Sequence, residues 1–290
     1  MSSTSNASSL SVLALFKNES TNIAEWISHY LGQQVEQIIL VDNGSTDCWQ
    51  PIVQSLNSES QIICLSDRRK HAQVEIYRSI LKSGIVKTEW LLVCDIDEFA
   101  YARLGFSGLN DYLNQNISAD VGAVMLPWKN FGSSGHISQP SSLRTSFVRR
   151  AKVPYPEPFQ GHSRGKYICR VRDTFDLSVH RPLLSKGKFI LSSGRDISGS
   201  IGQIRKGFVP NNEDELALSC LHLNHYAAQS LEYFKEVKSR RGDVYHAHLE
   251  SKDISYFTKF DTNDVHDNEL ALMVQDVTSG QIRIPFSRGN

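Results

Sequence analysis

In the segment LLVCDIDEF at 91–99, an apolar run is followed at once by three carboxylates. An apolar run of this length favours a buried strand, so we expect the acid cluster at its C-terminal tip. Asp95 and Asp97 flank Ile96, which places both carboxylates on one side of an extended segment. Two carboxylates on one side repel each other unless a cation lies between them. Such oxygen ligands suit Mg²⁺ or Mn²⁺ carrying a phosphorylated substrate, and a solvated acidic turn is the alternative.

Three further apolar runs precede this strand, at 10–16, 35–41 and 61–65, and segments with helical spacing of apolar residues separate them. Strands that alternate with helical segments of about ten to fifteen residues favour parallel βαβ units. In such a sheet the strand ends meet at one edge, where ligands bind. The sequence therefore predicts an α/β fold in which the segments at 17–19, 42–47 and 95–98 line one crevice.

Composition narrows the function and the setting of the protein. The chain has 290 residues, and its 31 basic and 31 acidic side chains cancel, so no global charge attracts nucleic acid or an anionic membrane. Five cysteines without a Cys-x-x-Cys pair favour a reducing compartment over disulfides or structural zinc. No segment approaches the roughly 18 apolar residues that span a bilayer. We therefore expect a cytoplasmic protein, brought to a membrane surface only by a membrane-borne acceptor.

Two later segments carry further candidate chemistry. Trp128 is followed by a Gly- and Ser-rich stretch that ends at His136, and aromatic residues beside small ones suit a sugar platform. The alternative is a hairpin with a packed Trp. His225 precedes a helical stretch that ends in a basic cluster at 238–241, which would supply a metal ligand and charge for a diphosphate. A core His beside a solvated helix end is the alternative.

Together these motifs resemble a known family. The segments KNE at 17–19, VDNGSTD at 41–47 and DIDEF at 95–99 are similar to the nucleotide-sugar half of a family-2-like glycosyltransferase with the GT-A fold. The Trp128 to His136 stretch and the segment at 224–242 resemble the branch related to glycosyltransferase family 92, described for β-galactosyl transfer. The resemblance runs from about Leu10 to about Asp276.

The resemblance implies a Rossmann-like, nucleotide-diphospho-sugar transferase domain at 10–276, with a mostly parallel central sheet. Its nucleotide-sugar half would cover 10–100 and its loop-rich acceptor half 101–276, with a disordered tail at 1–9 and a C-terminal tail at 277–290. It further implies transfer of a hexosyl group, galactosyl favoured, from a UDP-linked sugar to a glycan or polysaccharide precursor. A metal-dependent phosphohydrolase or nucleotidyltransferase and a non-catalytic carbohydrate-binding protein are the alternatives.

The resemblance also implies roles for single residues. Asp95, Asp97 and His225 would hold Mn²⁺ or Mg²⁺, and Trp128 and His136 would face the acceptor. The residues that would bind the donor, at its base, ribose or diphosphate, are Lys17, Asn18, Glu19, Asp42, Asp95, Lys238 and Arg241.

Inversion at the anomeric carbon needs a base within about 3 Å of the acceptor hydroxyl. Family-2 enzymes usually have a Glu-Asp pair for this purpose, and the one such pair after the acid cluster is Glu213-Asp214. The sequence does not choose among the candidate bases, which are Asp173, His180, Asp196 and Asp214.

Overall fold

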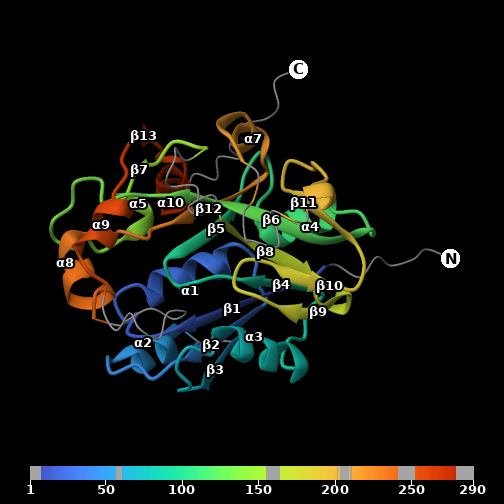
Figure 1. The fold of residues 1–290 in the computed structure, drawn as a ribbon, viewed down its shortest axis with the longest axis horizontal. Helices are drawn as coiled ribbons and strands as arrows, with labels where there is room; N and C mark the ends of the chain where they lie inside the picture. The colour runs from blue at the N-terminus through green and yellow to red at the C-terminus, as the bar shows by residue number, and fades with distance from the viewer. Residues whose placement is uncertain are drawn as a thin grey trace.

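The computed structural model describes residues 8–56, 61–154, 164–200, 202, 209, 211–240 and 252–278. Within these ranges a nine-stranded sheet has the order β3-β2-β1-β4-β8-β6-β12-β5, with β11 also paired to β6. The strands are β1 (Leu10–Phe16), β2 (Gln37–Asp42), β3 (Ile62–Ser66), β4 (Trp90–Val93), β5 (Glu98–Ala102), β6 (Val121–Asn130), β8 (Gly165–Arg170), β11 (Lys188–Leu191) and β12 (Leu221–His225). Figure 1 shows the sheet passing from β3 at the bottom to β6 and β12 at the top.

The first half of the chain forms the predicted βαβ units. Strands β1, β2, β3 and β4 pair in parallel, and the helices α1 (Ile23–Gly32), α2 (Trp49–Leu56) and α3 (Gln73–Lys82) connect them. Alternate residues of β1 enter two core clusters, since Val12 belongs to the cluster that contains Trp26 of α1 and Leu13 to the cluster that contains Ile76 of α3. Helices therefore cover both faces of this part of the sheet, which is why its strands are almost wholly apolar.

The α/β fold with a mostly parallel sheet is confirmed, and the second half of the chain adds antiparallel strands to it. Strand β8 lies between β4 and β6 and is antiparallel to both, and β12 is antiparallel to β5. The predicted halves at 10–100 and 101–276 therefore share one sheet. Their boundaries, and the tails at 1–9 and 277–290, stay predictions.

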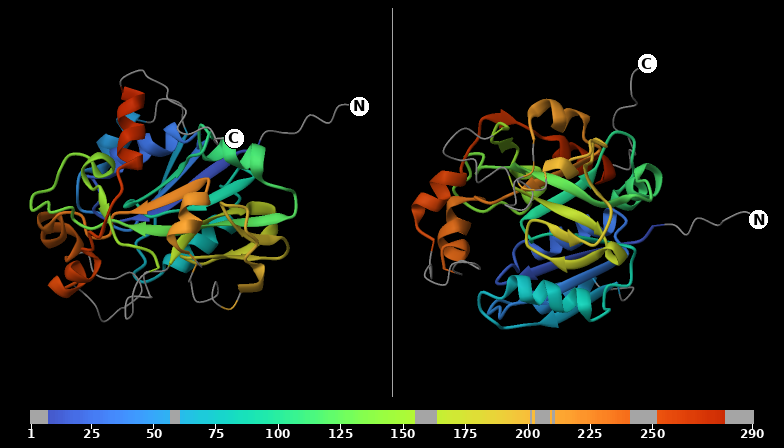
Figure 2. Two further views of the ribbon diagram at one scale, coloured as in Figure 1. Left: turned by 90° about the horizontal axis from the view of Figure 1, so that it is seen from above. Right: turned by 45° about the vertical axis from the view of Figure 1, so that its right-hand side comes forward.

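Shorter elements fill the rest of the second half. They are α4 (Leu109–Asn116), α5 (Leu143–Ser146), β7 (Arg149–Arg150), η2 (Val171–Asp173), β9 (Thr174–Leu177), β10 (Pro182–Leu184), η3 (Ser198–Ser200), α7 (Glu213–Leu218), α8 (Leu231–Tyr233), η4 (Phe234–Lys238), α9 (Ile254–Phe260), β13 (Val265–His266) and α10 (Glu269–Thr278). In every view of Figures 1 and 2, α8 and α9 lie together at one end of the molecule. Among the described residues, no helix has the length and apolarity to cross a membrane.

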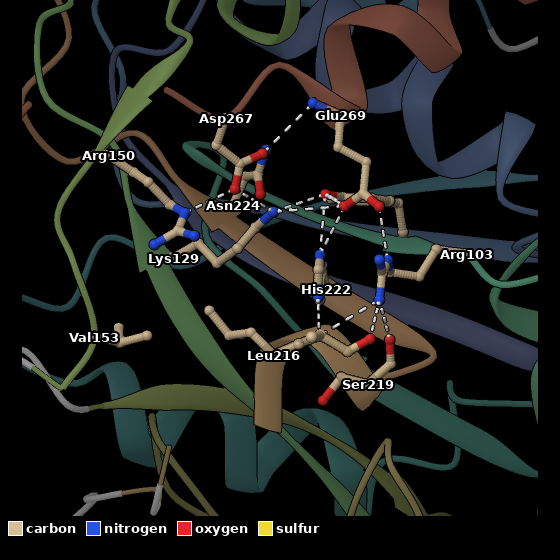
Figure 3. A network of polar contacts seen from close by, with 12 residues as sticks. Arg103, Lys129, Arg150, Val153, Leu216, Ser219, His222, Asn224, Asp267 and Glu269 are labelled. Atoms are coloured by element: carbon tan, nitrogen blue, oxygen red, sulfur yellow. Dashed lines mark hydrogen bonds and ion pairs between the residues drawn. The ribbon is translucent and has the colours of Figure 1, made fainter. Parts of the chain in front are cut away.

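A buried polar network fastens the C-terminal segment to the sheet (Figure 3). The ammonium group of Lys129 on β6 is fully enclosed and lies 3.0 Å from Asp267 Oδ2 and 2.9 Å from the Tyr101 hydroxyl. Glu269 at the start of α10 lies 2.9 Å from His222 Nδ1 on β12. A buried charge is tolerated only when it is paired and hydrogen-bonded, so this network holds β13 and α10 in a fixed place against β6 and β12.

Candidate functional site

The acid cluster forms the turn between β4 and β5, at the carboxyl edge of the parallel strands. The Asp95 amide donates to Glu98 Oε2 at 2.8 Å, and the Glu98 amide donates to the Asp95 carbonyl at 3.0 Å. The Trp26 indole of α1 donates to the same carbonyl at 2.9 Å. These bonds close the turn and fix the direction in which its carboxylates project.

Asp95 is paired with a buried lysine that the sequence did not single out. Lys166 Nζ on β8 lies 2.9 Å from Asp95 Oδ2 and 3.5 Å from Glu98 Oε2, and the lysine side chain is fully enclosed. Burial alone would lower the pKa of Lys166, but the two carboxylates hold that pKa well above the usual lysine value. Lys166 is therefore a permanent counter-charge inside the site.

Glu98 joins the acid cluster to the next strand of the site. Its carboxylate is fully buried, and Oε1 accepts a hydrogen bond from Trp128 Nε1 at 2.6 Å. Burial raises the pKa of Glu98, and the ammonium group of Lys166 opposes that rise. Glu98 therefore sets the position of the Trp128 ring at the end of β6.

Asp97 is paired with Lys238, one of the predicted donor-binding residues. Lys238 Nζ, at the end of the short π-helix η4, lies 2.7 Å from Asp97 Oδ2. The same ammonium group donates to the carbonyls of Ala227 at 2.7 Å and Tyr226 at 3.1 Å. All three hydrogens of the Lys238 ammonium group thus have acceptors, and its positive charge is fixed beside the Asp97 carboxylate.

His225 faces the second oxygen of Asp97. Its Nδ1 lies 2.7 Å from Asn130 Oδ1, and because an amide oxygen only accepts, Nδ1 carries the hydrogen. The lone pair of a neutral imidazole is then on Nε2, which lies 3.9 Å from Asp97 Oδ1. The ring also packs on Trp128 with centroids 4.2 Å apart and planes inclined by 31°.

The positions of Asp97 and His225 can be compared with those of ligands to the predicted metal. A histidine that binds a metal through one ring nitrogen usually donates a hydrogen bond from the other ring nitrogen, and this bond fixes the orientation of the ring. Asp97 Oδ1 and His225 Nε2 therefore fit one divalent cation as two ligands, and Mg²⁺-type sites often add only substrate phosphates and waters. Asp95 Oδ2 is directed to Lys166 instead. Within the described residues, no group of three or more His, Cys, Asp and Glu side chains forms a complete metal site.

The predicted donor residues at 17–19 and Asp42 lie at the same edge of the sheet, because Phe16 is in register with Asp42 on the parallel neighbour strand. Asp42 Oδ1 accepts from the Ser45 amide at 2.8 Å, and Asn18 Oδ1 accepts from the Thr46 amide at 2.7 Å. The two loops therefore brace each other. Lys17 is partly exposed in the first of them.

Glu19 has a structural contact that the sequence did not predict. Its carboxylate is buried and accepts hydrogen bonds from Tyr233 of α8 at 2.7 Å and from Asn22 at 3.0 Å. The loop after β1 is thereby tied to the helix that leads to Lys238. Arg241, the last predicted donor residue, lies outside the described residues.

The two predicted acceptor residues lie in different surroundings. Trp128 is almost fully buried, and its ring contacts His225 and, edge-on at 5.2 Å between centroids, His180. His136 is half-buried against α5, where Nε2 lies 3.0 Å from the Ser146 carbonyl and the ring packs on Phe147. Only Trp128 joins the acid cluster by contacts in the described chain.

Of the four candidate bases, His180 lies at the site. Its Nδ1 is 3.1 Å from the Gly165 carbonyl, and burial lowers the pKa of His180 well below its usual value, so the ring is neutral near pH 7. Asp173 follows the end of β8 that pairs with the start of β4, which places it at the opposite edge of the sheet and removes it as a base.

The other two candidate bases are exposed to solvent. Asp196 accepts from the Ser198 amide at 2.8 Å, and Asp214 lies in the first turn of α7. The carboxylate of Glu213, the neighbour of Asp214 in the predicted Glu-Asp pair, lies 2.8 Å from Arg150 Nη2.

No family model and no curated protein matches the chain. Among solved structures, the chain is similar to S. aureus TarS 1–349 in complex with UDP, at 17% identity over 56% of this chain and 47% of that one, with a TM-score of 0.37.

Two other solved structures show a similar partial likeness. One is mannosyl-3-phosphoglycerate synthase from Rubrobacter xylanophilus, at 14% identity over 57% of this chain and 54% of that one, with a TM-score of 0.32. The other is glucosyl-3-phosphoglycerate synthase from Mycobacterium tuberculosis with Mn²⁺, UDP and glucosyl-3-phosphoglycerate, at 15% identity over 57% of each chain, with a TM-score of 0.32. The overlap spans about half of each protein.

Proposed function

We propose that this protein is a metal-dependent glycosyltransferase that moves a hexosyl group from a nucleotide sugar to a glycan or polysaccharide precursor. The observation that carries the proposal is the environment of Asp97, which lies between Lys238 at 2.7 Å and His225 at 3.9 Å. These groups stand at the carboxyl edge of parallel strands, where α/β proteins bind their ligands. The Asp42 loop lies at the same edge and would contact the nucleotide base.

Each residue of the site would have its own role in the reaction. Asp97 and His225 would hold Mn²⁺ or Mg²⁺, and the bound ion would act as a Lewis acid on the diphosphate leaving group. Lys238 places a positive charge where negative charge grows as the sugar–phosphate bond breaks. Lys166 offsets part of the negative charge of Asp95 and Glu98, which reduces the repulsion between the acid cluster and the incoming diphosphate. Asp95 would also reach the ribose.

The finer features of the proposal follow from the sequence resemblance. We propose a UDP-linked donor, with galactosyl favoured, and inversion at the anomeric carbon. Of the candidate bases, we assign this step to His180, because it is the one that contacts Trp128. We further propose a cytoplasmic setting in which the acceptor, when it is membrane-borne, brings the protein to the membrane surface.

The test is a set of melting curves with UDP, GDP or ADP, each with and without Mn²⁺. A ligand at 100 times its Kd adds about 2.7 kcal/mol to the free energy of unfolding, so a bound nucleoside diphosphate raises the melting temperature. We expect UDP with Mn²⁺ to do so in the wild type and not in Asp97→Asn. Asp120→Asn, a matched change at an exposed carboxylate, should keep the response.

A product assay separates this function from other chemistry at the same site. A glycosyltransferase releases a nucleoside diphosphate from the sugar nucleotide, whereas a phosphohydrolase or nucleotidyltransferase releases a monophosphate or pyrophosphate. Release of UMP would overturn the transferase proposal. The absence of any nucleotide response with any metal would leave a carbohydrate-binding protein.

A further inference from the structure

A narrow pocket adjoins the proposed site at Trp128, which lines it. Its other walls include the Val153–Pro154 peptide, Arg164 just before β8 and Asn211 just before α7. Its enclosed space is about 10 Å³, which is room for about one water-sized group. The pocket therefore takes one oxygen atom of a sugar substituent, and the rest of the sugar lies outside it.

Two side chains of this pocket have buried polar atoms without hydrogen-bond partners. They are Nε of Arg164 and both amide atoms, Oδ1 and Nδ2, of Asn211. A buried donor or acceptor that stays unpaired costs about 1–3 kcal/mol, and native proteins retain few of them. Three such atoms on two residues of one pocket indicate a polar group that binds there.

The positive charge of Arg164 indicates that the group bound in this pocket is an anion. Its Nη1 lies 3.4 Å from Nε2 of the neutral His180 ring. No ion pair among the described residues involves Arg164. A guanidinium group presents its donors in a planar fork that matches a carboxylate or a phosphate. Arg164 is thus a cation with an unmet donor and no described counter-charge.

We propose that this pocket binds an anionic substituent of the acceptor sugar, a carboxylate or a phosphate, and this proposal rests on the proposed transferase function. An anionic oxygen accepts hydrogen bonds from Arg164 Nε and Asn211 Nδ2, while a hydroxyl group of the same sugar donates to Asn211 Oδ1. A neutral sugar leaves the guanidinium group without a counter-charge. The protein therefore selects acidic acceptors.

Contacts connect this pocket with the donor side. Trp128 lines the pocket, packs on His225 and binds Glu98 through its indole nitrogen. His225 in turn faces Asp97. One aromatic side chain thus separates the anion from the proposed metal ligands, which is the short spacing that transfer between donor and acceptor needs.

The test compares glucuronate, glucose 6-phosphate and glucose as probes, with binding followed by ligand-observed NMR on the full chain. We expect at least one of the two anionic sugars to bind about tenfold or more tightly than glucose, and the tighter of the two identifies the anion. Arg164→Gln should lose this preference and keep the response to UDP with Mn²⁺. Arg172→Gln, which removes a largely exposed guanidinium group, should keep both.

Two results would overturn the proposal. One is equal binding of the three probes to the wild type, which means that the pocket holds water only. The other is an undiminished preference for anions in Arg164→Gln. Circular dichroism establishes that this variant folds, and Asn211→Ala, with an expected severalfold loss, serves in its place if it does not. A missing UDP response would instead overturn the transferase proposal, because the two measurements use different ligands.

Discussion

The ammonium group of Lys238 lies 2.7 Å from the carboxylate of Asp97, although the two residues belong to opposite halves of the chain. Lys238 is only 3% exposed and also binds two backbone carbonyls. Because these bonds fix the lysine, its charge remains in place when a ligand binds to Asp97. The pair therefore provides a preorganised positive charge at the end of the acid cluster.

The first prediction concerns this charge. Lys238→Met should weaken binding of UDP in the presence of Mn²⁺ by about tenfold or more, because it removes the charge-assisted hydrogen bond that positions Asp97, and such a bond contributes about 1.5–3 kcal/mol. Isothermal titration calorimetry measures the change. Lys235→Met, an exposed neighbour on the same short helix, is the matched control. Equal affinities for UDP in the two variants would show that Lys238 acts on the fold alone.

The second prediction concerns Lys166. Lys166→Met leaves Asp95 and the buried Glu98 without their cation, and removal of one partner from a buried ion pair costs about 3–5 kcal/mol. The midpoint of urea unfolding should fall accordingly. Lys188→Met removes one partner of an exposed pair with Asp120 and should change the stability by less than about 1 kcal/mol. Adding Glu98→Gln to Lys166→Met should restore part of the loss.

The third prediction separates the effect of Trp128 on donor binding from its effect on transfer to the acceptor. Trp128→Phe keeps the aromatic packing and removes the donor to Glu98 Oε1, which should lower the free energy of unfolding by about 1–3 kcal/mol. Binding of UDP with Mn²⁺ should stay within about twofold, since Trp128 contacts His225 and not Asp97 in the described structure. Transfer to an added acceptor should fall further than UDP affinity. A loss of UDP affinity as large as the loss of transfer contradicts this division.

The fourth prediction is a dependence of stability on pH. Burial lowers the pKa of His222 to about 4 and that of His29 to about 3. The unfolded chain therefore binds more protons than the folded protein below about pH 6.5, and stability falls as the pH decreases from there toward about 4. Each histidine contributes a slope of up to about 1.4 kcal/mol per pH unit.

Urea unfolding at pH 7, 6 and 5 measures this slope. His222→Gln should reduce it by about a third, because one of the three buried imidazoles with a lowered pKa, which are His29, His180 and His222, is then absent. His266→Gln, an exposed histidine on β13, should leave the slope unchanged. A wild-type stability that stays constant from pH 7 to pH 5 would falsify the assignment of neutral, buried imidazoles.

The parallel part of the fold could be predicted because its signals are local. The runs that became β1, β2, β3 and β4 are apolar on both faces, and turn residues end each of them. The placement of β8 between β4 and β6 could not be predicted, because the pairing of Val93 with Tyr167 depends on residues far apart in the chain. The periodicity of apolar residues within one strand does not indicate which strand lies next to it in the sheet.

The same limit applies to the site. Asp95 and Asp97 are conspicuous in sequence, whereas their cationic partners are not. The signal for Lys166 was a single lysine inside the apolar strand β8, which is unusual for a residue type that is rarely buried without a partner. Arg164 and Asn211 gave no signal, because a missing hydrogen-bond partner becomes visible only in three dimensions.

The strand order has a consequence for biosynthesis. β12 lies between β5 and β6, so β5, which follows the acid cluster at once, finds its neighbour in the sheet only after residue 225 has been made. At about 5–20 residues per second, the ribosome needs on the order of ten seconds to pass from β5 to β12. Throughout that interval the nascent chain holds three clustered carboxylates and an unpaired strand. A chain truncated before β12 therefore cannot complete either the sheet or the site.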